Sequence, residues 1–222
     1  MYYTRLLVPD IRLKMCYVHW IKVKELISAG IWNSISRLSQ VLSDGLDLVI
    51  TNIWISAYLM GELSIAQQIP TYISTLTNTL INLFSPNLTM YYAKDDTEAV
   101  VKELKLSMKF SSFFVNIIFC VLVVFGKYFV QLWVPNQDVN LIYSLLVVIM
   151  MSLMVSGVTT SLNNVFLITN RLKVNSIFWL IISFTNVLFV FIYLNTTSLG
   201  IYAVAGVSKV TGILGNLIFV PL

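Results

Sequence analysis

The fold is decided by residues 31–60, IWNSISRLSQVLSDGLDLVITNIWISAYLM. This stretch is long enough to cross a bilayer, yet Arg37, Asp44 and Asp47 interrupt its apolar residues. In a helix that turns by about 100° per residue, its polar side chains share roughly 80° of arc. They are Asn33, Arg37, Gln40, Asp44, Asp47 and Thr51, and an aliphatic stripe lies opposite them.

The charges of this stretch predict a polar cavity. Inside a bilayer each central charge costs about 2.5–3.5 kcal/mol on insertion scales, so it must face a partner or water. We interpret residues 31–60 as the wall of a polar cavity in a membrane protein. The alternative is that the charges form buried structural pairs.

The composition independently indicates a membrane protein. Hydrophobic residues make up 58% of the 222 residues and charged residues only 11%, with a mean hydropathy of +0.84. Soluble domains carry about a quarter charged residues, so this chain would leave a large apolar surface in water. The formal net charge is +4. We expect membrane lipids, and no nucleic acid, as partners of such a chain.

The sequence contains no recognisable metal-ligand pattern, and no metal or cofactor is expected. Cys16 lies in a basic segment and Cys120 in an apolar run, so we expect no disulfide between them. His19 is the single histidine, and we interpret it as an interfacial residue beside Tyr17 and Trp20.

Six apolar stretches predict an all-α, polytopic membrane bundle. The expected spans are residues 31–60, 64–84, 110–130, 141–168, 174–194 and 201–220. Residues 1–29 are expected to form a basic cytoplasmic tail, and residues 30–222 the transmembrane lobe. Gly61-Glu62 is expected to make the first turn.

Residues 87–109 are expected to form a charged loop. Asp96 or Thr97 can cap a short helix there, which would carry its apolar residues on one side. We expect that helix to rest on the membrane surface, and an ordinary solvated run of charges is the alternative.

The basic residues predict the orientation. Eleven of them lie in the tail, in the loop after the second span and in the loop after the fourth, whereas the opposite loops carry only Lys127. Because cytoplasmic loops are enriched in Lys and Arg, both termini are expected to be cytoplasmic. The two remaining basic residues, Arg37 and Lys209, lie within spans.

Two further spans have a polar side. In the second, the residues that share one helical azimuth are Gln67, Thr71, Ser74, Asn78 and Ser85. In the fourth, they are Ser152, Ser156, Thr159, Asn163 and Asn170. Pro70 interrupts the hydrogen-bond ladder of the second span and is expected to kink it.

Several short stretches, in their order and spacing, resemble one family. They are Gly30-Ile-Trp-Asn33, Ser43-Asp-Gly-Leu-Asp-Leu48, Phe84-Ser-Pro-Asn-Leu-Thr89, Tyr92-Ala93, Phe125-Gly126, Leu132-Trp-Val134 and Thr169-Asn-Arg-Leu-Lys-Val-Asn175. The family is that of the bacterial capsular and O-antigen polysaccharide flippases, in the multidrug/oligosaccharidyl-lipid/polysaccharide exporter superfamily. The resemblance runs from about Tyr3 to the last residue, but only to the second half of such a protein.

The resemblance implies one six-helix lobe of a two-lobe transporter of the bacterial inner (cytoplasmic) membrane. The implied substrate is an undecaprenyl-pyrophosphate-linked oligosaccharide, which crosses the membrane by alternating access. The expected partners are that lipid-linked oligosaccharide, membrane lipids and a missing first lobe. We therefore expect the chain to be a fragment of a transporter, or half of one.

The candidate site residues follow from the chemistry of such a substrate. Arg37 is expected to bind the diphosphate, because its planar fork matches phosphate oxygens. Asn33, Gln40, Asn78 and Asn163 are expected to bind the substrate as well. The residues expected to form a buried charge pair, or to couple transport to an ion, are Asp44, Asp47 and Lys209.

Other functions remain open at this point. A multidrug or cation antiporter lobe of the same superfamily is one alternative, and an inactive truncated membrane fragment is another. An enzyme is not expected: Asp44-Gly45 matches only the start of a membrane phosphotransferase signature. On the outer side, Glu62, Lys127 and Asp138 are the only charged residues available for catalysis.

Overall fold

The computed structural model of the protein describes residues 19–169, 172–197 and 199–219. These residues form helices joined by short turns, and no strand occurs among them. The elements are α2 (Trp20–Ile50), the π-helix η2 (Thr51–Ile55), α3 (Ala57–Asn82), α4 (Ser85–Ala93), α5 (Thr97–Trp133), α6 (Val139–Ile168), α7 (Leu172–Thr196) and α8 (Ile201–Phe219). The prediction of an all-α bundle is confirmed.

Four of the described helices are long and apolar enough to cross a membrane by length and composition. The segments that meet this condition are Thr97–Trp133, Val139–Phe166, Lys173–Thr196 and Ile201–Ile218. Helices α2 and α3, of 31 and 26 residues, lie in the same bundle, but they carry the polar residues that the sequence placed in the first two spans.

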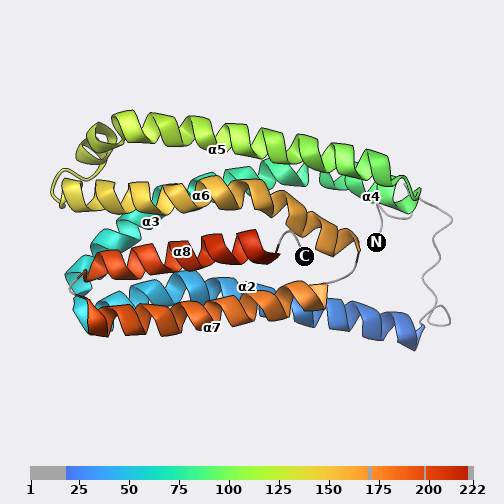
Figure 1. The fold of residues 1–222 in the computed structure, drawn as a ribbon, viewed down its shortest axis with the longest axis horizontal. Helices are drawn as coiled ribbons and strands as arrows, with labels where there is room; N and C mark the ends of the chain where they lie inside the picture. The colour runs from blue at the N-terminus through green and yellow to red at the C-terminus, as the bar shows by residue number, and fades with distance from the viewer. Residues whose placement is uncertain (1–18, 170–171, 198, 220–222) are drawn as a thin grey trace, which may run out of the picture.

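The helices pack as two pairs with α8 between them (Figure 1). Helix α2 packs mainly on α7, and α3 packs mainly on α6, while α5 packs on α6 and also contacts α3. Helix α8 contacts both α6 and α7. Consecutive helices α2 and α3 therefore belong to different pairs and contact each other little.

An apolar core joins the two pairs at one end of the bundle. Its fully buried residues include Leu63 near the start of α3, Val130 near the end of α5, Ile142 in α6, Val190 in α7 and Val204 in α8. All of these elements turn at the same end of the bundle, on the left in Figure 1. The lobe is therefore sealed by packing at that end.

The first turn lies at Ser56, not at Gly61-Glu62 as predicted. Thr51–Ile55 form a π-helical turn, and the extended backbone of Ser56 (φ −170°, ψ 155°) then starts α3. The Ser56 side chain accepts a hydrogen bond from the backbone N–H of Leu59 at 3.1 Å, which caps the new helix. Glu62 is instead buried inside α3, where its Oε1 accepts a hydrogen bond from the Asp138 N–H at 3.3 Å.

The boundaries of the predicted tail and loop also differ in the structure. Residues 20–29 belong to α2, and the earlier part of the predicted tail lies outside the described residues. Asp96 does cap a helix, because its Oδ1 accepts from the Ala99 N–H at 3.0 Å. That helix is not short: it continues through the predicted third span to Trp133. No Gly or Pro separates the charged segment from the apolar one, so the helix has no reason to stop.

Serines hold α2 against α7. Ser176 donates to the carbonyl of Trp32 at 2.7 Å, and its hydroxyl lies 2.7 Å from that of Ser36. Seven residues further along both helices, Ser183 donates to the carbonyl of Ser39 at 3.0 Å. Small hydroxyl side chains allow the two backbones to approach closely in an apolar environment.

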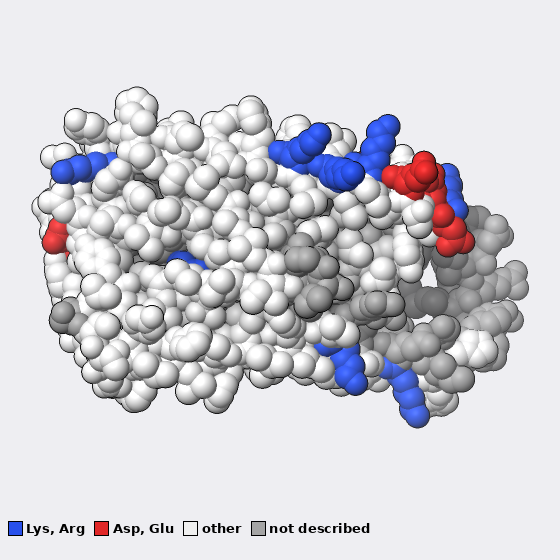
Figure 2. Space-filling model, viewed as in Figure 1, with Lys and Arg blue, Asp and Glu red and all other residues white. Residues whose placement is uncertain are grey.

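Charged residues avoid the middle of the molecular face shown in Figure 2. Most Lys and Arg side chains gather toward the end where α4 meets α5 and where α7 begins, and the centre is white apart from one blue spot. This distribution is typical of a protein with an apolar belt between two polar ends.

Candidate functional site: a polar cavity between the two helix pairs

A cavity of about 490 Å³ opens where α2 and α3 separate. Five helices line it: α2 and α7 on one side, α3 and α6 on the other, and α8 between them. The lining residues lie near the middle of these helices, beyond the apolar core that seals the opposite end. The cavity therefore penetrates the interior of the lobe and does not pass through it.

Most of the described residues that line this cavity are polar. Its hydroxyl and amide residues are Ser39, Gln67, Thr71, Ser74, Thr75, Ser152, Ser156, Asn186, Ser208 and Asn216. Its other residues are Arg37, Lys209, Pro70, Ile149, Leu153, Trp179, Ile182 and Gly212. A lining of this kind suits water and a polar ligand, although the outer surface of the bundle is apolar.

Two cationic side chains face this cavity from different helices. Arg37 comes from α2 and is exposed, whereas Lys209 comes from α8 and is half-buried. None of the described lining residues is acidic. The described lining therefore carries positive side chains, and a guanidinium can bind two oxygens of a phosphate at once.

Hydroxyl groups on α3 present acceptor oxygens to the cavity. Thr71 donates to the carbonyl of Gln67 at 2.7 Å, and Thr75 donates to the carbonyl of Thr71 at 2.9 Å. Each hydroxyl hydrogen is thus used within the helix, while the oxygen lone pairs stay available. This wall can accept hydrogen bonds from a ligand.

Asp47 is buried beside the cavity. Its side chain is 1% exposed, and its Oδ1 accepts a hydrogen bond of 2.6 Å from the hydroxyl of Ser208. Ser208 precedes Lys209 in α8, so the structure brings Asp47 next to the segment that carries this lysine. The Asp44 side chain lies outside the described part of the structure, and the pairing of Lys209 with Asp44 or Asp47 stays a prediction.

The other predicted binding residues lie outside the described lining. Asn33 and Asn78 are exposed on α2 and α3, and Asn163 is half-buried on α6. The Gln40 side chain belongs to those that the structure does not describe. Of the residues predicted to bind substrate, the structure places Arg37 on the cavity, and Lys209 joins it from the predicted charge pair.

Sequence reasoning missed the contribution of α7. Asn186 and Trp179 line the cavity from this helix, and Asn216 lines it from α8, where it accepts a hydrogen bond from Thr159 at 3.0 Å. One signal was present in the sequence, because Asn186 follows Ser183 and Thr185 within a mainly apolar run. A polar residue in such a run is expected to face a partner or a cavity.

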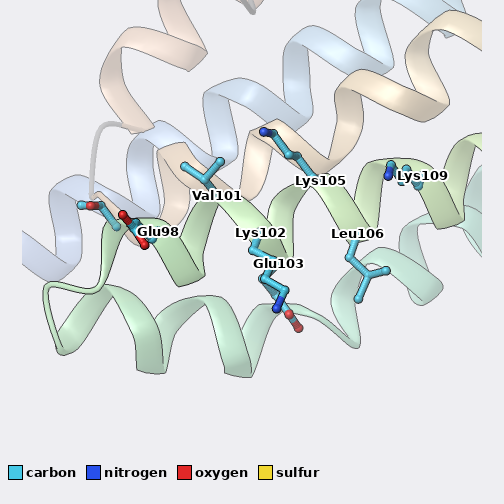
Figure 3. A pocket seen from close by; sticks show the side chains of 8 residues that line it. Glu98, Val101, Lys102, Glu103, Lys105, Leu106 and Lys109 are labelled. Carbon is cyan, nitrogen blue, oxygen red and sulfur yellow. The ribbon is translucent and has the colours of Figure 1, made fainter.

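A second hollow lies on the surface of α5 and is more open (Figure 3). It has a volume of about 630 Å³ and is lined from one helix by Thr97, Glu98, Val101, Lys102, Glu103, Lys105, Leu106 and Lys109. Figure 3 shows these side chains spreading in several directions along the helix. Because they do not converge and carry both signs of charge, we do not regard this hollow as the functional site.

The described residues contain no group of three or more His, Cys, Asp or Glu side chains that could hold a metal ion. Cys120 is a free, exposed cysteine on the apolar part of α5.

Comparisons with known proteins agree with this architecture. No family model matches the sequence. The chain is 25% identical over 221 residues to the uncharacterized membrane protein EpsK of Bacillus subtilis (strain 168), and the match covers 100% of the chain and 44% of that protein. It also resembles the crystal structure of a MATE protein in complex with MaL6, with a TM-score of 0.69 and 15% identity over 95% of this chain and 47% of the other.

The chain is a multi-pass membrane protein with the fold of about half of a MATE protein. It spans less than half the length of both proteins that it matches. The prediction of a polytopic membrane helix bundle is confirmed, whereas the prediction of a polysaccharide flippase needs a further argument.

Proposed function

We propose that the chain is one lobe of a flippase for lipid-linked oligosaccharides of the undecaprenyl-diphosphate class. The proposal depends on the cavity, which combines the cations Arg37 and Lys209 with hydroxyls and amides. Cationic side chains suit the oxygens of a diphosphate, and hydroxyls and amides suit the hydroxyls of a sugar. No bond needs to be made or broken, so the proposed activity is transport and not catalysis.

The shape of the lobe supports entry of the substrate from one side. The apolar core closes the end that carries Asp138, and the basic residues concentrate at the other end. By the positive-inside rule the basic end is cytoplasmic, as are both termini, and the membrane is the bacterial cytoplasmic membrane. In the described conformation the lobe would receive a substrate from the cytoplasm and would release it after the sealed end has opened.

A second lobe is part of the proposal. The solved structure and the Bacillus subtilis relative are both about twice as long as this chain. We propose that another six-helix lobe faces the opening between α2 and α3 and provides the other wall of the transport path. Membrane lipids would cover the apolar outer faces of α5 and α7.

A multidrug or cation antiporter lobe is the second candidate. The fold likeness to a MATE protein favours it, as does Trp179 in the cavity, because an aromatic face attracts organic cations. Two cationic side chains in the same cavity oppose it. The third candidate is a lobe that assembles with others but transports nothing itself.

The proposed function is tested in membranes of the host cell. Inverted vesicles would be prepared from the wild-type strain, from a strain that lacks the gene, and from a strain with Arg37→Ala at the natural locus. We expect both altered strains to accumulate lipid-linked oligosaccharide in the cytoplasmic leaflet, measured with an impermeant sugar-oxidising reagent. Normal distribution in the deletion strain, together with increased sensitivity to lipophilic cations, would favour the antiporter.

A further inference from the structure

Two amide side chains that line the cavity have polar atoms without a hydrogen-bond partner among the described residues. They are Nε2 of Gln67, a donor, and Oδ1 of Asn186, an acceptor. Both atoms are buried, and the whole side chain of Asn186 is only 4% exposed. A buried polar atom without a partner destabilises a protein, so each of these amides gains free energy when a side-chain rotation brings the atom to water or to a ligand in the cavity.

The third amide that lines the cavity, Asn216, differs from Gln67 and Asn186 because both of its polar atoms have hydrogen-bond partners. Asn216 donates through Nδ2 to the carbonyl of Gly212 at 2.9 Å and accepts through Oδ1 from Thr159 at 3.0 Å. The bond from Thr159 links α6 to α8, so the Asn216 side chain has a structural role in packing these two helices. Gln67 and Asn186 have no comparable structural explanation in the described part of the chain.

The two unpartnered atoms belong to opposite walls. Gln67 lies on α3 and Asn186 on α7, and these two helices do not contact each other over the described residues. Helix α8 lies between the two helix pairs and brings Lys209 to the same cavity. A ligand held by the cations would therefore have a donor on one side and an acceptor on the other.

We propose that Gln67 and Asn186 form the site that recognises the sugar part of the ligand. A sugar carries several hydroxyl groups, each of which accepts and donates a hydrogen bond, so separate hydroxyls of one sugar can satisfy Gln67 on one wall and Asn186 on the other, whereas a lipophilic cation satisfies neither. This inference depends on the proposed function and extends it: the cations hold the diphosphate, and these two amides select ligands that carry neutral hydroxyl groups.

The test measures binding by the full chain in detergent or nanodiscs, with the fluorescence of Trp179 as the reporter. Trp179 lines the cavity, and a Trp179→Phe variant identifies its contribution to the signal. The probes are farnesyl diphosphate, the same lipid diphosphate carrying N-acetylglucosamine, and tetraphenylphosphonium. The variants are Gln67→Leu and Asn186→Leu, and Asn195→Leu is the matched control because Asn195 is exposed on α7 and donates only to its own helix.

We expect each amide variant to bind the sugar-carrying probe about three- to tenfold more weakly, which is the effect of one neutral hydrogen bond. Binding of farnesyl diphosphate should not change, and Asn195→Leu should behave as the wild type. Equal losses for both diphosphate probes, or no loss for either, would overturn the assignment of the amides and leave the proposed function standing. Binding of tetraphenylphosphonium without binding of either diphosphate would overturn both, and a monodisperse chain that binds none of the probes would overturn the assignment of the amides.

Discussion

At the scale of single residues, the buried carboxylate of Asp47 depends for its stability on the groups that surround it. A charged group in an apolar bundle is costly to bury unless hydrogen bonds or an opposite charge compensate it. The hydroxyl of Ser208 provides one such bond, which it donates to Oδ1 of Asp47 at 2.6 Å. A single hydroxyl on α8 therefore helps to keep a charge buried in α2.

Replacing Ser208 with alanine should destabilise the folded chain by about 1.5–3 kcal/mol, the contribution of a hydrogen bond to a charged group. Thermal unfolding in detergent would measure the loss. Ser34→Ala is the control, because Ser34 is exposed and donates only to the carbonyl of Gly30 in its own helix. If both variants unfold at the same temperature, the bond to Asp47 does not contribute to stability.

The pairing of Lys209 is a separate prediction. A Lys209→Ala substitution should lower the folded yield, because a buried carboxylate would lose its countercharge, at a cost of roughly 3–5 kcal/mol in soluble cores. Adding Asp44→Asn should restore part of that yield if Asp44 is the partner, and adding Asp47→Asn should do so if Asp47 is. Yields would be compared by size-exclusion chromatography in detergent. Equal defects in the single and double variants would show that neither acid pairs with Lys209.

Residue patterns identified part of the candidate site. The polar stripe of residues 31–60 placed Arg37 on a cavity, because charges in an apolar helix must face a polar space. The same stripe also included Asn33, which lies one helical turn before Arg37 in α2, is exposed, and is not among the residues that line the cavity. Helical periodicity gives the direction of a side chain but not the depth at which a cavity ends. Asn186 was missed although Asn175 and Ser183 lie on the same side of its helix, because the residues around them are mainly apolar.

At the scale of elements, close packing depends on small residues at particular contacts. A Cβ atom added at Gly157 of α6 would lie 3.0 Å from Cγ2 of Val115, a completely buried β-branched residue of α5. A Cβ atom added at Gly206 of α8 would meet nothing within 4 Å. The two glycines are therefore not equivalent, although both lie inside helices.

Gly157→Ala should therefore destabilise the chain by about 1–3 kcal/mol, because the stiff side chain of Val115 has little room to move. Gly206→Ala should leave stability unchanged or raise it by up to about 1 kcal/mol, since alanine is the better helix former. Unfolding temperatures of the two variants would be compared in the same detergent. A gain for Gly157→Ala would mean that α5 and α6 are packed less closely than described.

The sequence predicted that the helices exist more accurately than it predicted where they begin and end. Gly61 suggested a turn because glycine often ends helices, but the chain turns five residues earlier at Ser56. A serine cap and a π-helical turn have weak sequence signals inside an apolar run. The charged residues of 87–109 suggested a loop, whereas α4 and a longer α5 occupy this region because charge alone does not end a helix.

At the scale of the whole molecule, the two ends of the bundle are predicted to face different compartments. A cysteine in place of Asp138, in a chain without its natural cysteines, should react with an impermeant thiol reagent added to intact cells. A cysteine in place of Asp95, in the turn between α4 and α5, should react only after the cells are opened. Both positions are exposed, so accessibility within the protein does not limit the comparison. The reverse pattern would invert the topology and the proposed direction of transport.

The length of α5 has a mechanical consequence. Its 37 residues make a rod of about 56 Å, whereas the hydrocarbon layer is about 30 Å thick. The charged part before Phe110 is therefore a lever arm of about 20 Å, braced by α4 through a 3.0 Å hydrogen bond from Asn87 to Glu103. If the arm turns by about 20° about its base near Phe110, its tip moves roughly 7 Å, a motion that a distance probe at Lys102 could record without touching the cavity.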